Sequence, residues 1–486
     1  MQDKNLTDIQ KHWDTQASTN LSSIDWLGEE ITRNEVIFKI STARNLIKEL
    51  TLLKRSESKD IFGVAIEDSL DNLALGIALI LEGVTQAIIP IDATETQFED
   101  LCARYQVTIL ATSKSISNSE TWKQTAIETN KIYFYRRHFN KDQTEKETND
   151  ETSTKEYRSL KLLLGTTSGT TNNRPEIISI NSKDTSVRIK ETLWSPYHLV
   201  RRPLVGTSMQ NWSSRLQKLL LILRGKSFVA RHGTQSFREQ PFIDDCDGTL
   251  ISPNGLRQWI ALGNMQYLGA DFLIISGSDR VPMNLREELS VIKNINLGIT
   301  YATSQTGPIT WLPPDALLEE EDSVGWPLKE VSIHPIETKD SLYKNGKVFN
   351  EAIISTPRTT FNPGDFLRIS KSGQIIFGGR SNDSFLYNSL LISPIEIEDV
   401  VYRHAGVKEC VAFGAKSNRF GAVAMVGLVI YKEFNFQQML GEVDQLCREF
   451  LGIRRPHKII LMDKIPKNQS GKALRRELSK QYSLQQ

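Results

Sequence analysis

A stretch rich in serine, threonine and glycine, TTSGTTNNRPEIISI, occupies residues 166–180. It follows an apolar segment at 160–164 and runs into another apolar segment after Pro175. Small residues that offer many N–H and O–H donors with little bulk are typical of a loop that cradles phosphate. Such loops commonly also carry a lysine, but Glu176 follows Pro175 here. The pattern therefore predicts a phosphate-binding loop whose missing positive charge comes from elsewhere.

A linker is the alternative interpretation of this stretch, because short polar runs of the same composition also join domains. The run GTTSGTTNN lacks the GK[ST] ending of a Walker loop, so that motif is excluded. Five further stretches that could carry chemistry follow along the chain. They are ISGSD at 275, YATSQTG at 301, NPGDF at 362, GRSND at 379 and PKNQSGKALRREL at 466.

Alternating strands and helices must position these stretches. Residues 62–93 predict a strand, an apolar helix ending near Gly83 and a second strand, which together form a βαβ unit and imply a parallel sheet. The run LQKLLLIL at 216–223 predicts a buried helix stopped at Gly225, with a strand starting at Phe228. Ser393, followed by Pro394 and then by a glutamate, predicts a helix start with serine as the N-cap.

Composition sets the broad class of the protein. The chain has 486 residues, 39% hydrophobic and 24% charged, with a formal net charge of +1, so its charge favours neither nucleic acid nor an anionic membrane. The four cysteines form no CxxC pair and are interpreted as reduced thiols. The N-terminal residues are polar, and residues 74–91 are broken by Glu82, Gln86 and Pro90. We therefore expect a cytoplasmic protein that does not span a membrane.

In their order and spacing, the six stretches resemble the motifs of the adenylate-forming superfamily, which includes acyl-CoA synthetases, carrier-protein ligases and the adenylation domains of peptide synthetases. The resemblance runs along essentially the whole chain. It implies an α/β fold with a large N-terminal adenylate-forming domain at 1–380, made of parallel sheets and a small β-barrel-like subdomain. A smaller, mobile α+β C-terminal lid domain is expected at 381–486, and the polar GRSND stretch marks the boundary.

The resemblance also implies a reaction, in which ATP and a carboxylic acid give acyl-AMP and pyrophosphate and the acyl group then passes to a thiol. Asp365 would accept hydrogen bonds from the ribose hydroxyls, and Arg380 would reach the ribose. Lys472 would offset the charge that develops at the phosphate, although taken alone it reads as a solvated lysine of a basic terminal helix. It is also the proposed source of the missing charge. The remaining nucleotide-binding positions are Thr167, Ser168, Gly169, Thr170 and Thr171 for the phosphates, and Gly277, Ser278, Asp279, Tyr301 and Ala302 around adenine.

Several positions depart from the family pattern. Glu176 replaces the loop lysine, and Ser304, assigned a catalytic role, stands where the family has threonine. Gln305 replaces the glutamate that helps hold Mg²⁺, and an amide oxygen is a weaker ligand for this hard cation than a carboxylate. Leu386 replaces a lysine, and Ser389 replaces the glycine that lines the pantetheine tunnel. These last two changes put transfer to a thiol in more doubt than adenylation.

The acid is expected to be an aryl or alkyl acid. The position that holds the α-amino group in peptide-synthetase domains falls on or beside Trp212, although core packing explains this tryptophan equally well. Gly277 and Gly298 complete the expected substrate residues. The expected cosubstrates are ATP with Mg²⁺ and, as the thiol acceptor, CoA or the phosphopantetheine of an acyl carrier protein. Two alternatives stay open, namely an adenylating enzyme with a non-thiol acceptor and a degenerate member that binds nucleotide or acyl-AMP without turnover.

Overall fold

The computed structural model describes residues 3–19, 21–52, 60–116, 121–129, 132–137, 160–166, 177–190, 196–206, 208–231, 237–238, 243, 245–269, 271–292, 295–303, 306–336, 341–357, 359–417, 420–467 and 472–483. The chain forms two compact units. The first comprises Met1–Leu193 and His198–Thr249, and the second comprises Trp194–Tyr197 and Leu250–Gln486. Both units are mixed α/β with parallel strand pairs, as expected.

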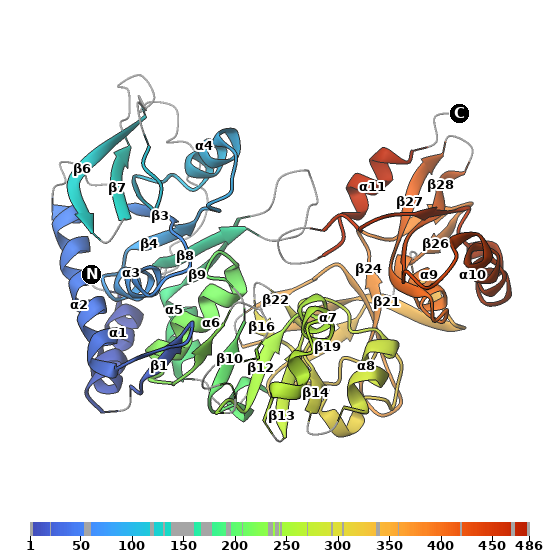
Figure 1. Ribbon diagram of the computed structural model, residues 1–486, viewed down its shortest axis with the longest axis horizontal. Helices are drawn as coiled ribbons and strands as arrows, with labels where there is room; N and C mark the ends of the chain where they lie inside the picture. Colours follow the sequence, from blue (N-terminus) through green and yellow to red (C-terminus); the bar gives the residue numbers. More distant parts are fainter. Residues whose placement is uncertain are drawn as a thin grey trace. The chain divides into compact units, whose positions relative to one another are not determined.

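The first unit is built around a seven-stranded sheet, drawn in blue to green in Figure 1. The three central strand pairs are parallel, namely β3 with β4, β3 with β5 and β4 with β8. The outer strand pairs are antiparallel. In order across the sheet the strands are β6 (Trp122–Thr129), β7 (Ile132–Arg137), β5 (Ile109–Thr112), β3 (Ile61–Ala65), β4 (Thr85–Ile88), β8 (Lys161–Thr166) and β9 (Ile177–Asn181).

The predicted βαβ unit is present as β3, α3 (Leu70–Leu81) and β4. Ser69 caps α3 by accepting a hydrogen bond from the Asn72 N–H. The helix is buried almost throughout, which explains why its sequence is apolar on every face. Gly83 follows with a φ of 67°, a left-handed conformation that favours glycine. The other helices of this unit are α1 (Lys4–Thr19), α2 (Arg33–Leu52), α4 (Glu95–Arg104), α5 (Ser182–Lys190) and α6 (Trp212–Leu223).

A second strand group of the first unit contains β1 (Ile24–Trp26), β2 (Glu29–Ile31), β10 (Pro203–Val205) and β11 (Val229–Ala230). The helix predicted at 216–223 is confirmed as α6, which begins slightly earlier, and β11 starts at the expected place. The start of β12 (Gly248–Ile251) pairs with β10, and the chain passes to the second unit within this strand.

The second unit begins with a parallel pair, β13 (Phe272–Ser276) and β14 (Ile295–Ile299), accompanied by α7 (Pro253–Ala261) and α8 (Met283–Ser290). An antiparallel sheet follows in the order β19-β21-β23-β24, with β20 and β22 also pairing with β21. These strands are β19 (Ser332–Pro335), β20 (Leu342–Lys344), β21 (Lys347–Ser355), β22 (Thr360–Phe361), β23 (Asp365–Ile369) and β24 (Ile375–Arg380). Two short antiparallel pairs are formed by β15 (Ala302–Thr303) with β16 (Gly307–Pro308) and by β17 (Thr310–Trp311) with β18 (Trp326–Pro327).

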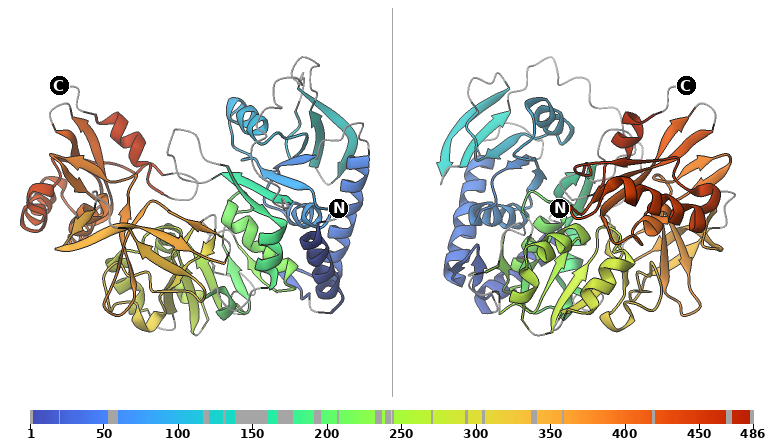
Figure 2. Two further views of the ribbon diagram at one scale, coloured as in Figure 1. Left: turned by 180° about the vertical axis from the view of Figure 1, so that it is seen from behind. Right: turned by 45° about the vertical axis from the view of Figure 1, so that its right-hand side comes forward.

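The C-terminal part of the second unit has its own sheet, in the order β26-β25-β28-β27 with β29 on β28, and Figure 2 shows it from two further sides. Its apolar core is formed between this sheet and the helices α9 and α10. The strands are β25 (Phe385–Tyr387), β26 (Leu390–Ile392), β27 (Val407–Ser417), β28 (Gly421–Ile430) and β29 (Lys458–Leu461), and the helices are α9 (Pro394–Val401), α10 (Phe436–Leu451) and α11 (Arg475–Gln481).

The capping role predicted for Ser393 is wrong in its detail. Ser393 is the N-cap residue of α9, but its side chain makes no capping hydrogen bond. Its hydroxyl instead donates to the Gly378 carbonyl oxygen at 2.9 Å, which ties the start of α9 to β24. The two compact units separate within β12 rather than at residue 380, so a domain boundary at 380 stays a prediction. No helix among the described residues is both long enough and apolar enough to cross a membrane.

Candidate active site

The parallel pairing of β13 with β14 brings two of the predicted stretches together. Ser276 and Ile299 are register partners at the carboxyl ends of these strands, so the residues that follow them share one edge of the sheet. The contact is close, since a Cβ at Gly277 would lie 2.7 Å from the Thr300 carbonyl oxygen. Glycine is therefore required at 277 for this approach. Ser278 and Asp279 are exposed beyond it, and Ser278 has a φ of 72°.

Tyr301 and Asp365 are joined by a hydrogen bond. The phenol of Tyr301 donates to Asp365 Oδ2 at 2.5 Å, and Asp365 is only 4% exposed. Burial and the neighbouring carboxylate raise the pKa of Tyr301 well above 10, so the phenol keeps its proton and remains a donor. The Tyr301 ring lies 6.2 Å from that of Phe377, measured between centroids. The aromatic residue expected beside adenine thus contacts the carboxylate expected at the ribose.

Arg380 lies beside Asp365 because β23 and β24 pair in antiparallel register, with Asp365 opposite Arg380. Arg380 Nε is 3.7 Å from Asp365 Oδ1, an ion pair too long for a hydrogen bond. Within the described residues, Asp365 Oδ1 has no hydrogen-bond partner. Burial raises the pKa of Asp365, while Arg380, the Tyr301 hydroxyl and Lys472 act in the opposite direction. Asp365 therefore offers a buried acceptor oxygen that a ligand hydroxyl could satisfy.

The charge of Lys472, near the far end of the chain, acts on this carboxylate and lowers its pKa. A bridge between Lys467 and Ala473 and a hydrogen bond from Leu474 N–H to the Pro466 carbonyl hold its segment just before α11. Burial and Arg380 lower the pKa of the Lys472 ammonium, whereas Asp279, Asp365 and Asp383 raise it. The charges of two cations and three carboxylates thus shift the pKa of Lys472 or Asp365. These groups come from stretches of the sequence as distant as those of Asp279 and Lys472. The positive pair can meet an anionic ligand.

These residues fit a nucleotide. Among the described residues, no hydrogen bond reaches Asp365 Oδ1, so this oxygen can accept one from a ribose hydroxyl, and Tyr301 holds the other oxygen. Arg380 and Lys472 are both positively charged and both act to lower the pKa of Asp365. A bound nucleotide would supply the reactive phosphate, and the chain would supply position and charge.

Trp212 and Gly298 are each explained by packing. A Cβ at Gly165 would lie 2.1 Å from the Trp212 ring, so Trp212 covers the end of β8 in the first unit. A Cβ at Gly298 would lie 2.0 Å from the Trp311 ring, so that glycine makes room for Trp311. Ala302 is half-buried in the short hairpin strand β15. Substrate-binding roles for Trp212 and Gly298, and a nucleotide role for Ala302, stay predictions.

The remaining assigned residues fall outside the described part of the chain, and their roles stay predictions. They are Thr167, Ser168, Gly169, Thr170, Thr171, Ser304 and Gln305, together with Glu176. The phosphate loop and the expected Mg²⁺ ligand therefore have no described geometry.

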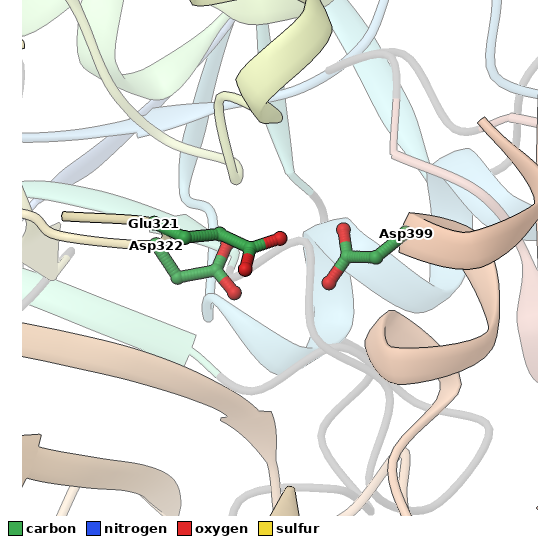
Figure 3. Close-up of side chains that lie close together, drawn as sticks. All are labelled: Glu321, Asp322 and Asp399. Carbon is green, nitrogen blue, oxygen red and sulfur yellow. The ribbon is translucent and has the colours of Figure 1, made fainter. Parts of the chain in front are cut away.

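The described residues contain one group of three potential metal ligands, Glu321, Asp322 and Asp399. Figure 3 shows the carboxylates of Asp322 and Asp399 facing each other, with Glu321 beside Asp322. Lys344 Nζ lies 2.6 Å from Asp322 and 2.7 Å from Asp399, and Arg280 also contacts both. Because two cations already neutralise the two buried carboxylates, this group does not fit Mg²⁺.

Residues that the sequence analysis did not assign surround the site. Asp383 belongs to the GRSND stretch and influences Lys472, yet only its neighbours were given roles. Arg280 directly follows the ISGSD stretch, and this position next to a predicted ligand-binding loop could have marked it as a candidate. No local pattern marks Lys344 or Asp399, because their partners are distant in sequence.

Comparison with known proteins gives a consistent picture. Residues 396–472 match the model of the AMP-binding enzyme C-terminal domain. The 2-succinylbenzoate–CoA ligase of Lactococcus lactis is 28% identical over 218 residues, covering 42% of this chain and 46% of that protein. The mitochondrial medium-chain acyl-CoA ligase ACSF2 of Mus musculus is 25% identical over 324 residues, covering 61% of this chain and 51% of that protein. The chain thus spans about half the length of these curated relatives.

Solved structures match over nearly the whole chain. The amide bond synthetase McbA from Marinactinospora thermotolerans has a TM-score of 0.72 at 15% identity, covering 98% of this chain and 100% of that one. The o-succinylbenzoate CoA synthetase MenE from Bacillus subtilis, in complex with the acyl-adenylate intermediate OSB-AMP, has a TM-score of 0.70 at 17% identity. The match covers 96% of this chain and 97% of that one. At these identities the likeness concerns the fold, with its large N-terminal and smaller C-terminal domains.

Proposed function

Because this chain is a member of the adenylate-forming superfamily, we propose that it activates a small carboxylic acid with ATP and transfers the acyl group to a thiol. In the first step a carboxylate oxygen attacks the α-phosphorus, the bond to the bridging oxygen breaks, and pyrophosphate leaves. In the second step the thiol sulfur attacks the acyl carbon, AMP leaves, and the thiol proton is lost. The acceptor is CoA or a carrier-protein phosphopantetheine.

One observation supports this proposal above the others, namely buried Asp365, whose Oδ1 has no hydrogen-bond partner among the described residues and whose pKa is lowered by the charges of Arg380 and Lys472. Asp365 accepts from the ribose, and Tyr301 with the 277–279 loop holds the base. Lys472 offsets the charge that builds up on the α-phosphate as the carboxylate attacks, an interaction stronger in the transition state than before it. Residues 167–171 contact the outer phosphates, and Gln305 takes part in holding Mg²⁺. The protein acts in the cytoplasm, and residues 381–486 move as a lid between the two steps.

The acid is an aryl or alkyl acid rather than an α-amino acid. Trp212 supports this, because a half-buried indole over Gly165 offers no anionic partner to an α-ammonium group. A panel of aryl, alkyl and α-amino acids tests the proposal directly. With ATP and Mg²⁺ present, pyrophosphate release should occur with some aryl or alkyl acids, and the Asp365→Ala variant should release none. Release with α-amino acids alone would contradict the assigned substrate class.

A non-thiol acceptor is the second candidate, and Ser389 is the observation that favours it. The family glycine of the pantetheine tunnel is replaced by Ser389, which sits in a left-handed conformation with a φ of 64°. Leu386, in place of a lysine, is 56% exposed on the same hairpin. The matched structure of McbA is that of an amide bond synthetase, so an amine is the first alternative acceptor to try. Acyl-AMP that is consumed by amines but not by CoA would favour this candidate.

A binding protein without turnover is the third candidate. Glu176 and Gln305 favour it, because each replaces a residue that the family uses to hold phosphate or metal. The presence of Asp365 together with Arg380 and Lys472, whose charges both act on it, argues against it. Measurable ATP binding without pyrophosphate release or exchange for any acid would favour this third candidate over both enzymatic ones.

A further inference from the structure

Four buried charged residues form a closed network in the second unit, which we call the four-charge cluster: Arg280, Asp322, Lys344 and Asp399. Lys344 Nζ bridges Asp322 and Asp399 at 2.6 and 2.7 Å. Arg280 donates to Asp322 at 2.6 Å and also to Asp399. Their side chains are between 4% and 10% exposed. Two positive and two negative charges balance, so the cluster is neutral as a whole.

The cluster joins parts of the chain that no helix or strand connects. Arg280 lies directly after the loop of Gly277, Ser278 and Asp279, while Lys344 ends β20. Asp399 lies on α9, the first helix of the C-terminal part, and its carboxylate faces that of Asp322 in Figure 3. Among the four residues, Asp399 alone comes from the segment that also carries Lys472.

We infer that the four-charge cluster positions the C-terminal segment for adenylation, by holding α9 against the nucleotide loop so that Lys472 faces Asp365. This inference rests on the proposed function and adds Arg280, Lys344 and Asp399 to it as positioning residues. Arg280 is covalently next to Asp279, and Asp279 already influences the Lys472 ammonium. Through Arg280 and Asp399, the cluster thus ties the residue after the 277–279 loop to the helix that begins the C-terminal part.

The physical reason is the cost of separating buried charges. If α9 moved away, Lys344 and Arg280 would share one carboxylate instead of two, which leaves an uncompensated positive charge in a buried place. Asp399 would also lose two charge-assisted contacts at once. An arrangement with α9 withdrawn is therefore disfavoured until water or other groups replace these contacts. The hydrogen bond from Ser393 to the Gly378 carbonyl oxygen holds the N-terminal end of the same helix, whereas Asp399 lies in its last turn.

A distance measurement tests the inference without any turnover. Cysteines replacing Val291 and Ile453, which are 82% and 68% exposed, would carry one spin label at the end of α8 and one just after α10 in the C-terminal part. The four native cysteines are buried, and burial raises the pKa of the Cys102, Cys246 and Cys447 thiols to about 12, so they resist labelling. We expect one narrow distance distribution in the otherwise unchanged protein.

The test variant is Lys344→Met combined with Asp399→Asn, which removes one charge of each sign and leaves the pair of Arg280 with Asp322. We expect this variant to broaden the distance distribution or add a second population. The control is Asp444→Asn, which breaks an exposed ion pair with Arg448 in the same C-terminal part. An unchanged distribution in the double variant would overturn the inference. Should that variant not fold, Asp399→Asn alone replaces it, with a shifted or broadened distribution supporting the inference and an unchanged one overturning it.

Kinetics give the second readout. In the double variant, acyl-AMP formation should slow roughly 10²-fold because Lys472 is misplaced, while transfer from supplied acyl-AMP stays near the original rate. Asp399→Glu, which keeps the charge, should recover part of the lost rate. Equal slowing of both steps would overturn the positioning role. Failure of the proposed function would look different, since no acid would then be activated by the unchanged protein, whatever the distances show.

Discussion

The Tyr301 hydroxyl and the Asp365 carboxylate form a hydrogen bond of 2.5 Å across 64 residues of sequence. The residue expected beside adenine thereby orients the residue expected to bind ribose. One carboxylate oxygen is occupied by the phenol and the other is left without a hydrogen-bond partner among the described residues. The site is therefore prepared for one strong ligand contact at Oδ1 before any nucleotide arrives.

Replacing Tyr301 with phenylalanine should destabilise the protein by about 1–3 kcal/mol, because a buried carboxylate oxygen loses its donor. Urea unfolding gives this free energy. The ring that would face adenine is kept, so a loss of ATP affinity in this variant reports on the orientation of Asp365. Tyr343→Phe is the matched control, since Tyr343 is 56% exposed and should change neither quantity. Unfolding curves that coincide for both variants would show that the hydrogen bond adds nothing.

Nucleotide binding should weaken on acidification at a pH above the ordinary pKa of an aspartate. Burial raises the pKa of Asp365 above 3.8, so the carboxylate takes up a proton earlier than an exposed one, and the protonated form accepts ribose hydroxyls poorly. Acidification has the opposite effect on the stability of the folded protein. A carboxyl whose pKa is raised by folding favours the folded state as the pH falls through that raised value. AMP titrations across this range measure the effect, and Asp365→Asn should bind weakly at every pH without this dependence.

Lys472→Ala should slow acyl-AMP formation by a factor of about 10²–10³, which is typical for removal of one transition-state charge interaction. Transfer from supplied acyl-AMP should be spared, because Lys472 serves only the first step. Single-turnover measurements of the two steps separate the effects. Lys464→Ala removes an exposed lysine of the same segment and should leave both rates unchanged. Equal slowing of the two steps by Lys472→Ala would mean that domain alternation is the wrong mechanism.

Ser389→Gly should stabilise the hairpin of β25 and β26. Asn388 and Ser389 form its two-residue turn with φ values of 48° and 64°, and Tyr387 pairs with Leu390. A left-handed conformation costs a non-glycine residue about 1–2 kcal/mol, so glycine should raise the free energy of unfolding by up to this amount. Thermal unfolding measures it. If Ser389 also obstructs the thiol path, transfer to CoA should speed up while adenylation is unchanged; slower transfer would show that the hydroxyl assists.

Gln305→Glu should lower the Mg²⁺ concentration needed for half-maximal pyrophosphate release. A carboxylate is a better ligand for a hard cation than an amide oxygen, and glutamate is the family residue at this place. The measurement is a Mg²⁺ titration at saturating ATP, compared with Gln437→Glu on the exposed start of α10. An unchanged requirement would place Gln305 outside the coordination shell.

The sequence by itself determined several local elements of this protein and proposed the residues of its candidate site. Helix α3 between β3 and β4, and helix α6 before β11, follow from continuous apolar runs and from glycine stops, which act between neighbours in the chain. The ordered stretches singled out Asp365, Arg380 and Lys472, and the structure brings these three together. The order of motifs was informative because it reflects a whole fold rather than one local preference.

Only the tertiary structure decided which distant charges meet. Arg280 and Asp399 are 119 residues apart, and neither periodicity nor a local motif encodes their contact. The Ser393 hydroxyl satisfies Gly378 instead of its own helix, because a buried carbonyl oxygen of β24 lies within its reach after folding. The absence of a side chain at Gly298 likewise leaves room for the Trp311 ring, a contact that exists only in the folded chain. Such pairings depend on which surfaces pack together, and that is fixed when the elements assemble, not residue by residue along the chain.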